Sequence, residues 1–197
     1  MDRVGLPEWL VKLAYKFVDV EKNSPTVDER VLEYSFAISK IAQMKPGNLL
    51  DVGCVARMNL IPAVACELGW KVQGIDIRNY NFEHPNFTFM KGSILGPLLR
   101  KDTFDVITCI STLEHIGIKG RYGEKCIPWG DRSTFNRVRE LLQDKGAFLV
   151  TLPFGKEYQV TSLNRIYDRD NLDWLCKGWK VVDEKYVGNL AMLELQK

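Results

Sequence analysis

From Asn48 onward, the sequence alternates short apolar runs with helical patterns, and this alternation limits the possible folds more than any other feature. The runs are apolar almost throughout and read NLLDVG, KVQGIDI, NFTFMKG, FDVITCIS and GAFLVTLP. Strands of this kind are buried on both faces, which is typical of a parallel sheet covered by helices. Helical patterns separate them, including one through Ala65 and one over residues 134–143, which Gly146 is placed to end. The sequence therefore predicts an α/β fold with a doubly wound, mainly parallel sheet and helices on both faces.

The end of the chain adds a short helix over residues 169–178 and two strands over residues 180–188 and 190–196. These strands bring the expected sheet to seven strands. We expect one of them to form an antiparallel edge, as in many mixed α/β sheets.

Two helical patterns precede the sheet, over residues 7–20 and 27–44, with apolar residues at helical spacing. We expect both helices to cover the sheet. Trp9 and Phe17 on the first helix suit a core contact or a dimer face equally, so a monomer and a homodimer both stay open.

The length of 197 residues suits one substantial domain and is too short for two. We therefore expect a single domain over residues 1–197, with the N-terminal helices in 1–45 and the sheet with its helices in 46–197.

Composition excludes several classes of partner. The net charge of +2 comes from 27 basic and 25 acidic side chains, which leaves no concentrated positive face for a phosphate backbone, so nucleic acid is not expected. We find no secretory signal pattern and no apolar run long enough to span a bilayer, so we expect a cytoplasmic protein without a membrane partner. The five cysteines form no CxxC pair that would suggest zinc or a redox site.

Three residues at strand ends locate the expected ligand site. Ligands of open α/β sheets bind beyond the carboxyl ends of the strands, where strand order reverses. Asp51 and Gly53 end the first strand, and Asp76 ends the second, 25 residues after Asp51. A carboxylate near this spacing accepts hydrogen bonds from ribose hydroxyls in dinucleotide-binding folds. A structural cap or turn role for Asp76 is an equal alternative.

A nicotinamide cofactor is the weaker choice for this site. Arg78 is placed to accept a 2′-phosphate, which keeps an NADP-dependent oxidoreductase open. The G-x-G-x-x-G fingerprint, however, requires glycines where this chain has Val55 and Met58.

Four segments together resemble those of class I S-adenosylmethionine (SAM)-dependent methyltransferases, which have a Rossmann-like fold. They occur in the family's order and read LLDVGC, GIDI, FDVITCISTLEHIG and LLQDKGAFLVTLP. The later stretches GRYG, NRIY and GW resemble those of small bacterial and archaeal methyltransferases. The resemblance implies SAM as cofactor, S-adenosylhomocysteine as product, and methyl transfer to a small acceptor molecule.

The resemblance also assigns the cofactor-binding residues. Asp51, Gly53 and Cys54 would form the loop under the methionine end of SAM, and Asp76 would hold the ribose diol. The adenine would be flanked by Ile77 and contacted at its edge by Gly92 and Ser93. The methyl-transfer face would be lined by Ile110 and Ser111.

The loop after Asp51 departs from the family pattern. A typical loop reads D-x-G-x-G-x-G, whereas this chain keeps the first glycine and has Val55 and Arg57 at the later positions. A second hypothesis follows, in which the chain is a non-catalytic binding module with a degenerate SAM loop.

Two residues after the fourth strand are candidates for the chemistry. The ordinary pKa of histidine lies near neutrality, so His115 suits a general base, with Glu114 beside it. In relatives the same histidine orients the loop, and this scaffold role stays open. No metal is expected, because Ser111 and the distant His84 offer no convergent ligand set.

The acceptor is expected to bind beyond the fourth and fifth strands. The glycine-rich stretch after His115 carries Arg121 and Tyr122, and Arg165 and Tyr167 follow the fifth strand. Arginine and aromatic side chains in a loop suit a sugar-like or carboxylated metabolite, by bidentate hydrogen bonding and stacking. Packing of the tail against the sheet is an equal alternative for Arg165 and Tyr167.

Overall fold

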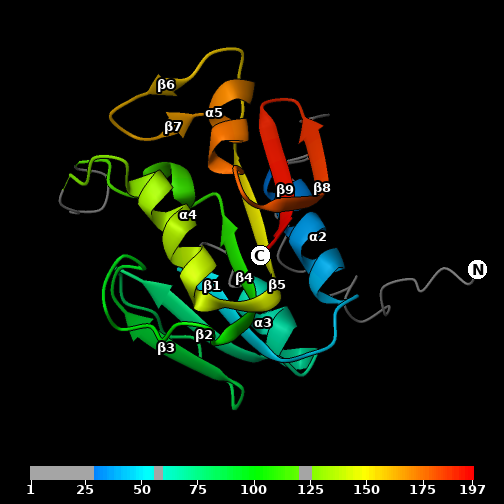
Figure 1. Cartoon of the computed structure of the whole chain (residues 1–197). Helices are drawn as coiled ribbons and strands as arrows, with labels where there is room; N and C mark the ends of the chain where they lie inside the picture. Colours follow the sequence, from blue (N-terminus) through cyan, green and yellow to red (C-terminus); the bar gives the residue numbers. More distant parts are fainter. Residues whose placement is uncertain (1–28, 56–59, 120–125) are drawn as a thin grey trace, which may run out of the picture.

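The computed structural model describes residues 29–55, 60–119 and 126–197. A seven-stranded sheet in the order β3-β2-β1-β4-β5-β9-β8 forms its centre (Figure 1). The strands are β1 (Asn48–Val52), β2 (Lys71–Asp76), β3 (Phe87–Lys91), β4 (Phe104–Ile110), β5 (Leu142–Pro153), β8 (Lys180–Val187) and β9 (Leu190–Gln196). The pairs from β3 to β5 are parallel, and β9 is antiparallel to both β5 and β8. The prediction of a mainly parallel, seven-stranded sheet is confirmed, but its antiparallel strand is β9, one place in from the edge.

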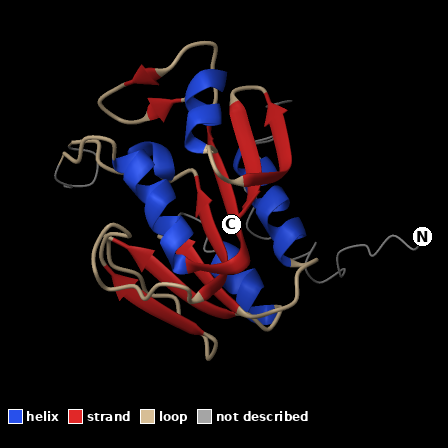
Figure 2. Cartoon of the chain, in the orientation of Figure 1, coloured by secondary structure: helices blue, strands red, loops and turns tan. Residues whose placement is uncertain are grey.

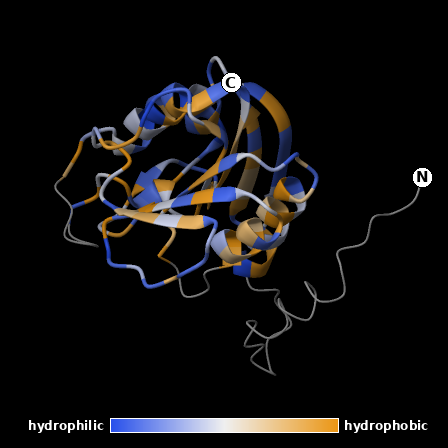
Figure 3. Ribbon diagram, turned by 90° about the horizontal axis from the view of Figure 1, so that it is seen from below, coloured by the Kyte–Doolittle hydropathy of each residue, from blue (hydrophilic) through white to orange (hydrophobic). Residues whose placement is uncertain are grey.

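Helices cover both faces of this sheet (Figure 2). On one face, α2 (Glu29–Ile41) and α3 (Leu60–Glu67) contribute to one apolar cluster. On the other face, α4 (Gly130–Leu141) and α5 (Arg169–Leu175) contribute to a second cluster that includes Phe148 of β5. Figure 3 shows that hydrophobic and hydrophilic residues alternate along the helices, as expected for helices that cover a sheet with one face.

Helix α2 is the described part of the N-terminal cover. Its apolar side packs against the sheet, and Lys40 forms ion pairs with Asp183 at 2.7 Å and Glu194 at 2.8 Å, which tie its end to β8 and β9. The helix expected over residues 7–20 lies outside the described residues.

One local prediction was wrong. The helix expected over residues 134–143 spans Gly130–Leu141, and β5 begins at Leu142, so Gly146 lies within the strand instead of ending the helix. Leu142 is already extended and pairs with Phe104, while Lys145 takes the left-handed conformation at φ 65°. The turn out of the helix therefore forms before the glycine is reached.

Strand order reverses between β1 and β4, and β1 pairs with β2 on its other side. The carboxyl ends of β2, β1 and β4 consequently meet at one edge of the sheet. Two short strands beyond this edge, β6 (Gln159–Val160) and β7 (Arg165–Ile166), form a hairpin between β5 and α5.

Candidate functional site

A tight turn follows β1 at the edge where strand order reverses. Gly53 has φ 77°, a conformation that glycine adopts without strain, and its N–H donates to the carbonyl of Ile75 on β2 at 2.9 Å. The Thr112 side chain occupies the space where a Cβ on residue 53 would lie. The turn is therefore crowded from the β4 side.

A small cavity of about 20 Å³ opens beside this turn. Its walls include Tyr34 of α2, Ile61 of α3, Ile110 of β4, and Asp51, Gly53 and Cys54 at the end of β1. Four of the residues assigned to cofactor binding thus meet in one cavity. Burial raises the pKa of the Cys54 thiol, so Cys54 is a neutral, apolar part of the wall.

Asp51 is a buried acid at the floor of this cavity. The Thr108 hydroxyl donates to its Oδ1 at 2.7 Å. Burial raises the pKa of Asp51 to about 7; the hydrogen bond from Thr108 opposes this shift, and the charge of Asp76 adds to it. A cation placed beside Asp51 would stabilise its ionised form.

Asp76 lies at the end of β2 with every acceptor position of its carboxylate in use. Oδ1 accepts the Arg78 N–H at 2.9 Å and Arg78 Nε at 3.0 Å. Oδ2 accepts the Val55 N–H at 3.1 Å and Arg78 Nη2 at 2.9 Å. A carboxylate offers about four such positions, so ribose hydroxyls can bind here once the Arg78 side chain turns away.

The remaining assigned adenosine contacts flank Asp76. Ile77 follows it directly, and the Gly92 N–H donates to the Asp76 carbonyl at 2.8 Å, which brings the loop after β3 against the end of β2. The Ser93 hydroxyl accepts from the Leu95 N–H at 3.3 Å within that loop. The geometry therefore brings together the strand-end residues that the sequence singled out.

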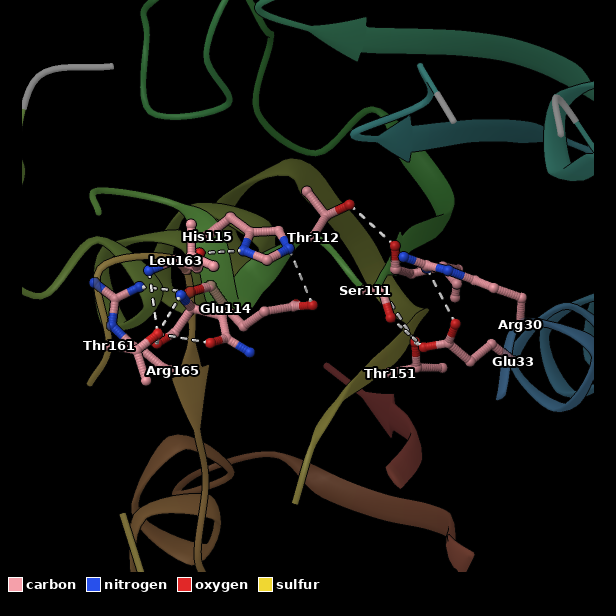
Figure 4. A network of polar contacts seen from close by, with 12 residues as sticks. Arg30, Glu33, Ser111, Thr112, Glu114, His115, Thr151, Thr161, Leu163 and Arg165 are labelled. Atoms are coloured by element: carbon pink, nitrogen blue, oxygen red, sulfur yellow. Dashed lines mark hydrogen bonds and ion pairs between the residues drawn. The ribbon is translucent and has the colours of Figure 1, made fainter. Parts of the chain in front are cut away.

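A buried carboxylate from α2 reaches the ends of β4 and β5 (Figure 4). Glu33 Oε1 accepts from the hydroxyls of Ser111 and Thr151, the latter at 2.7 Å, and Oε2 accepts from Arg30 Nη1 at 3.1 Å. Sequence reasoning assigned Ser111 but missed Glu33. The available signal was its spacing, because Glu33 lies three and four residues before Phe36 and Ala37 on the buried side of the helix.

His115 and Glu114 lie in the short helical turn after β4, η1 (Leu113–His115). His115 Nδ1 is 2.8 Å from the Leu163 carbonyl oxygen, and since a carbonyl only accepts, Nδ1 carries a proton. His115 Nε2 faces Glu114 Oε1 at 3.4 Å. Both ring nitrogens thus face protein groups, an arrangement that favours an orienting role over general-base catalysis.

Arg165 and Tyr167 are buried beneath the loop that carries His115. Arg165 donates to the Ile116 carbonyl at 2.8 Å and the Glu114 carbonyl at 3.4 Å, and its Nε lies 3.5 Å from Asp131 Oδ2. The Tyr167 hydroxyl donates to the same Asp131 oxygen at 3.2 Å. These contacts anchor the loop that carries His115. Arg121 and Tyr122 lie outside the described residues.

Solved structures match this fold along nearly the full chain. A 1,6-didemethyltoxoflavin-N1-methyltransferase of Burkholderia thailandensis, with 1,6-didemethyltoxoflavin and S-adenosylhomocysteine bound, is 18% identical at a TM-score of 0.64, and the match covers 100% of this chain and 92% of that one. A SAM-dependent methyltransferase of Aquifex aeolicus is 15% identical at a TM-score of 0.59, over 98% of both chains. The chain has the class I methyltransferase fold.

The same fold also serves other chemistry. The [4+2]-cyclase SpnF is 13% identical to this chain at a TM-score of 0.64, over 96% of this chain and 92% of that one. Likeness at these identities establishes the fold, while activity has to be argued from the site.

Sequence comparisons add little about activity. A family described as Caenorhabditis protein of unknown function, DUF268, matches residues 99–195, slightly less than half of the chain. No curated protein matches the sequence. Across the described residues, no helix combines the length and apolar character needed to cross a membrane, and no three potential ligand side chains gather as a metal site.

Proposed function

We propose that this chain is a SAM-dependent methyltransferase acting on a small polar acceptor with a hydroxyl or carboxyl group, such as a sugar-like metabolite. The observation that supports this most is the convergence of Asp51, Gly53 and Cys54 on one cavity, with Asp76 at the end of the adjacent strand. A cytoplasmic enzyme that works without a metal, as a monomer or homodimer, is part of the same proposal.

The proposed contacts follow the cofactor from its methionine end to its adenine. Asp51 and the turn at Gly53 would hold the cationic methionine end, and Asp76 would hold the ribose once Arg78 releases it. Ile77, Gly92 and Ser93 would surround the adenine. When bound, SAM supplies a methyl group on a positively charged sulfur, so the leaving group needs no protonation.

The protein would then contribute alignment and exclusion of water. Ile110 and Ser111 at the end of β4 would border the reacting centre. His115, held by Leu163 and Glu114, would fix the loop over the acceptor, with Arg165 and Tyr167 supporting that loop. Arg121 and Tyr122 remain our proposed acceptor contacts, in a segment outside the described residues.

Calorimetry with SAM and with S-adenosylhomocysteine tests this function. We expect both to bind the wild-type chain with micromolar dissociation constants, the range typical of enzyme ligands. Mass spectrometry of a panel of sugar and hydroxy-acid acceptors should then reveal a product heavier by one methyl group. A chain that binds neither ligand would not have this function.

A non-catalytic binding module is the second candidate. The four hydrogen bonds to Asp76 favour it, because protein groups already satisfy this carboxylate. Binding without turnover on any acceptor is its expected signature. An NADP-dependent oxidoreductase is disfavoured, because the Arg78 guanidinium lies on Asp76 instead of pointing outward to receive a phosphate.

Asp51 makes cofactor affinity depend on pH. Its carboxyl has a pKa of about 7 in the free protein, and the ammonium of the methionine end favours its ionised form. We expect the dissociation constant for SAM to fall about tenfold between pH 6 and pH 8, following the ionised fraction of the free protein. Calorimetry in two buffers of different ionisation enthalpy should show one proton released near pH 6.

The Asp51→Asn variant is the control, and we expect its weaker binding to be independent of pH. The ionisation of Asp51 affects folding stability in the opposite direction, so that stability falls as the pH rises. Because the folded pKa of Asp51 lies above its unfolded value, its contribution to stability is fully present below about pH 4 and is lost as pH rises through about 7. A wild-type affinity that stays constant from pH 6 to pH 8 would contradict a contact between Asp51 and the cofactor's cation.

A further inference from the structure

Glu33 is a buried carboxylate at the carboxyl edge of the sheet, and packing alone does not explain its charge. Its side chain is 1% exposed, whereas that of its ion-pair partner Arg30 is 45% exposed. Burying a carboxylate costs free energy unless hydrogen bonds and a counter-charge compensate. The two hydroxyl donors and Arg30 provide this compensation here.

The hydrogen bonds around Glu33 fix the direction of both hydroxyl groups. The Thr151 hydroxyl accepts the Ser111 N–H at 3.0 Å and donates to Glu33. The Ser111 hydroxyl also donates to Glu33. Both hydroxyl hydrogens therefore point at the carboxylate, and the hydroxyl oxygen of the partly buried Ser111 keeps its lone pairs as acceptors.

This network lies directly behind the wall of the cavity at the end of β1. Tyr34 and Ile110, the chain neighbours of Glu33 and Ser111, both line that cavity. Water screens the half-exposed Arg30 more than the buried Glu33, so the ion pair leaves a net negative potential behind this wall. Such a wall attracts a cation and offers nothing specific to a neutral group of the same shape.

We propose that Glu33, acting with Ser111, selects for a positively charged reacting centre in the cavity, so that the sulfonium of SAM is favoured over the neutral thioether of S-adenosylhomocysteine. This inference rests on the proposed function. It makes Glu33 a specificity-determining residue that favours entry of the cofactor and release of its product.

The Glu33→Gln substitution separates charge from anchoring. The Gln amide oxygen still accepts from Ser111 and Thr151, so the attachment of α2 to β4 and β5 is kept while the negative charge is lost. Arg30 is half-exposed and can turn into solvent. Arg30→Gln does the reverse, since it removes the positive charge and leaves Glu33 in place.

Calorimetric dissociation constants for SAM and S-adenosylhomocysteine give the decisive ratio. We expect the constant for S-adenosylhomocysteine divided by that for SAM to fall about tenfold in Glu33→Gln, as expected for the loss of one partly screened charge pair. The ratio should rise in Arg30→Gln. A purely structural role would weaken both ligands equally and leave the ratio unchanged.

Glu194→Gln is the matched control. Glu194 is another shielded carboxylate that pairs with α2, but it binds Lys40, seven residues along the helix from Glu33 and so about 10 Å away. In Glu194→Gln, the ratio of the two dissociation constants should equal that of the wild type.

An unchanged ratio in Glu33→Gln, or shifts in the same direction for Glu33→Gln and Arg30→Gln, would overturn the inference. If Glu33→Gln does not fold, Arg30→Gln alone decides, and an unchanged or lowered ratio overturns it. A wild-type chain that binds neither ligand overturns the proposed function itself, which is a separate result.

Discussion

Asp76→Ala is expected to weaken S-adenosylhomocysteine binding at least about hundredfold. The carboxylate would accept hydrogen bonds from two ribose hydroxyls, and hydrogen bonds to a charged group contribute about 1.5–3 kcal/mol each. The substitution also removes the acceptor of the Val55 N–H, which joins the loop after β1 to the end of β2. Calorimetry on the folded variant measures the loss.

Arg78→Ala tests the same contact from the other direction. Arg78 occupies Asp76 in the free protein, and its side chain is partly exposed, so the ion pair that ribose must displace is weak. We expect Arg78→Ala to bind S-adenosylhomocysteine about fivefold more tightly than the wild type, corresponding to about 1 kcal/mol for an exposed ion pair. Affinity unchanged in both variants would exclude Asp76 as the ribose contact, and lost NADP binding in Arg78→Ala would instead support the oxidoreductase.

The sheet was predictable because its signal is local. Runs such as FDVITCIS are apolar on both faces, and that pattern already implies a parallel sheet between helix layers. The positions of Asp51 and Asp76 followed, since the carboxyl ends of parallel strands meet at one edge. The end of α4 was missed because the sequence signal for it was Gly146, whereas the chain is already extended at Leu142.

The contacts at the site were less predictable, because they depend on side-chain direction and on distant segments. Arg78 has a long side chain that can reach either a ligand phosphate or the carboxylate two residues before it, and the sequence does not distinguish them. Glu33 and Ser111 are 78 residues apart, and nothing local to either one indicates their contact. From the sequence, Arg165 was expected to bind the acceptor. In the structure it is buried and donates hydrogen bonds to the carbonyls of Glu114 and Ile116.

Gly53→Ala is expected to destabilise the protein by about 3 kcal/mol. A residue with a Cβ pays about 1–2 kcal/mol at φ 77°. The new Cβ would also lie 2.3 Å from Thr112 Oγ1 and 2.4 Å from its Cγ2, and such overpacking costs about 1–3 kcal/mol. Urea unfolding measures the change, and S-adenosylhomocysteine binding should weaken as well, because the turn forms the cavity wall.

Gly188→Ala separates the two contributions. Gly188 also has a positive φ, 57°, but nothing lies within 4 Å of the position its Cβ would take. We therefore expect about 1 kcal/mol of destabilisation from backbone strain alone. Adding Thr112→Ala to Gly53→Ala should recover most of the part due to crowding, because the two nearest atoms are removed, while the Cβ of residue 112 at 2.9 Å and the backbone strain remain. Equal losses of stability in Gly53→Ala and Gly188→Ala would mean that the Thr112 side chain moves away at no cost. The turn after β1 would then tolerate a side chain at residue 53 despite its close contact with Thr112.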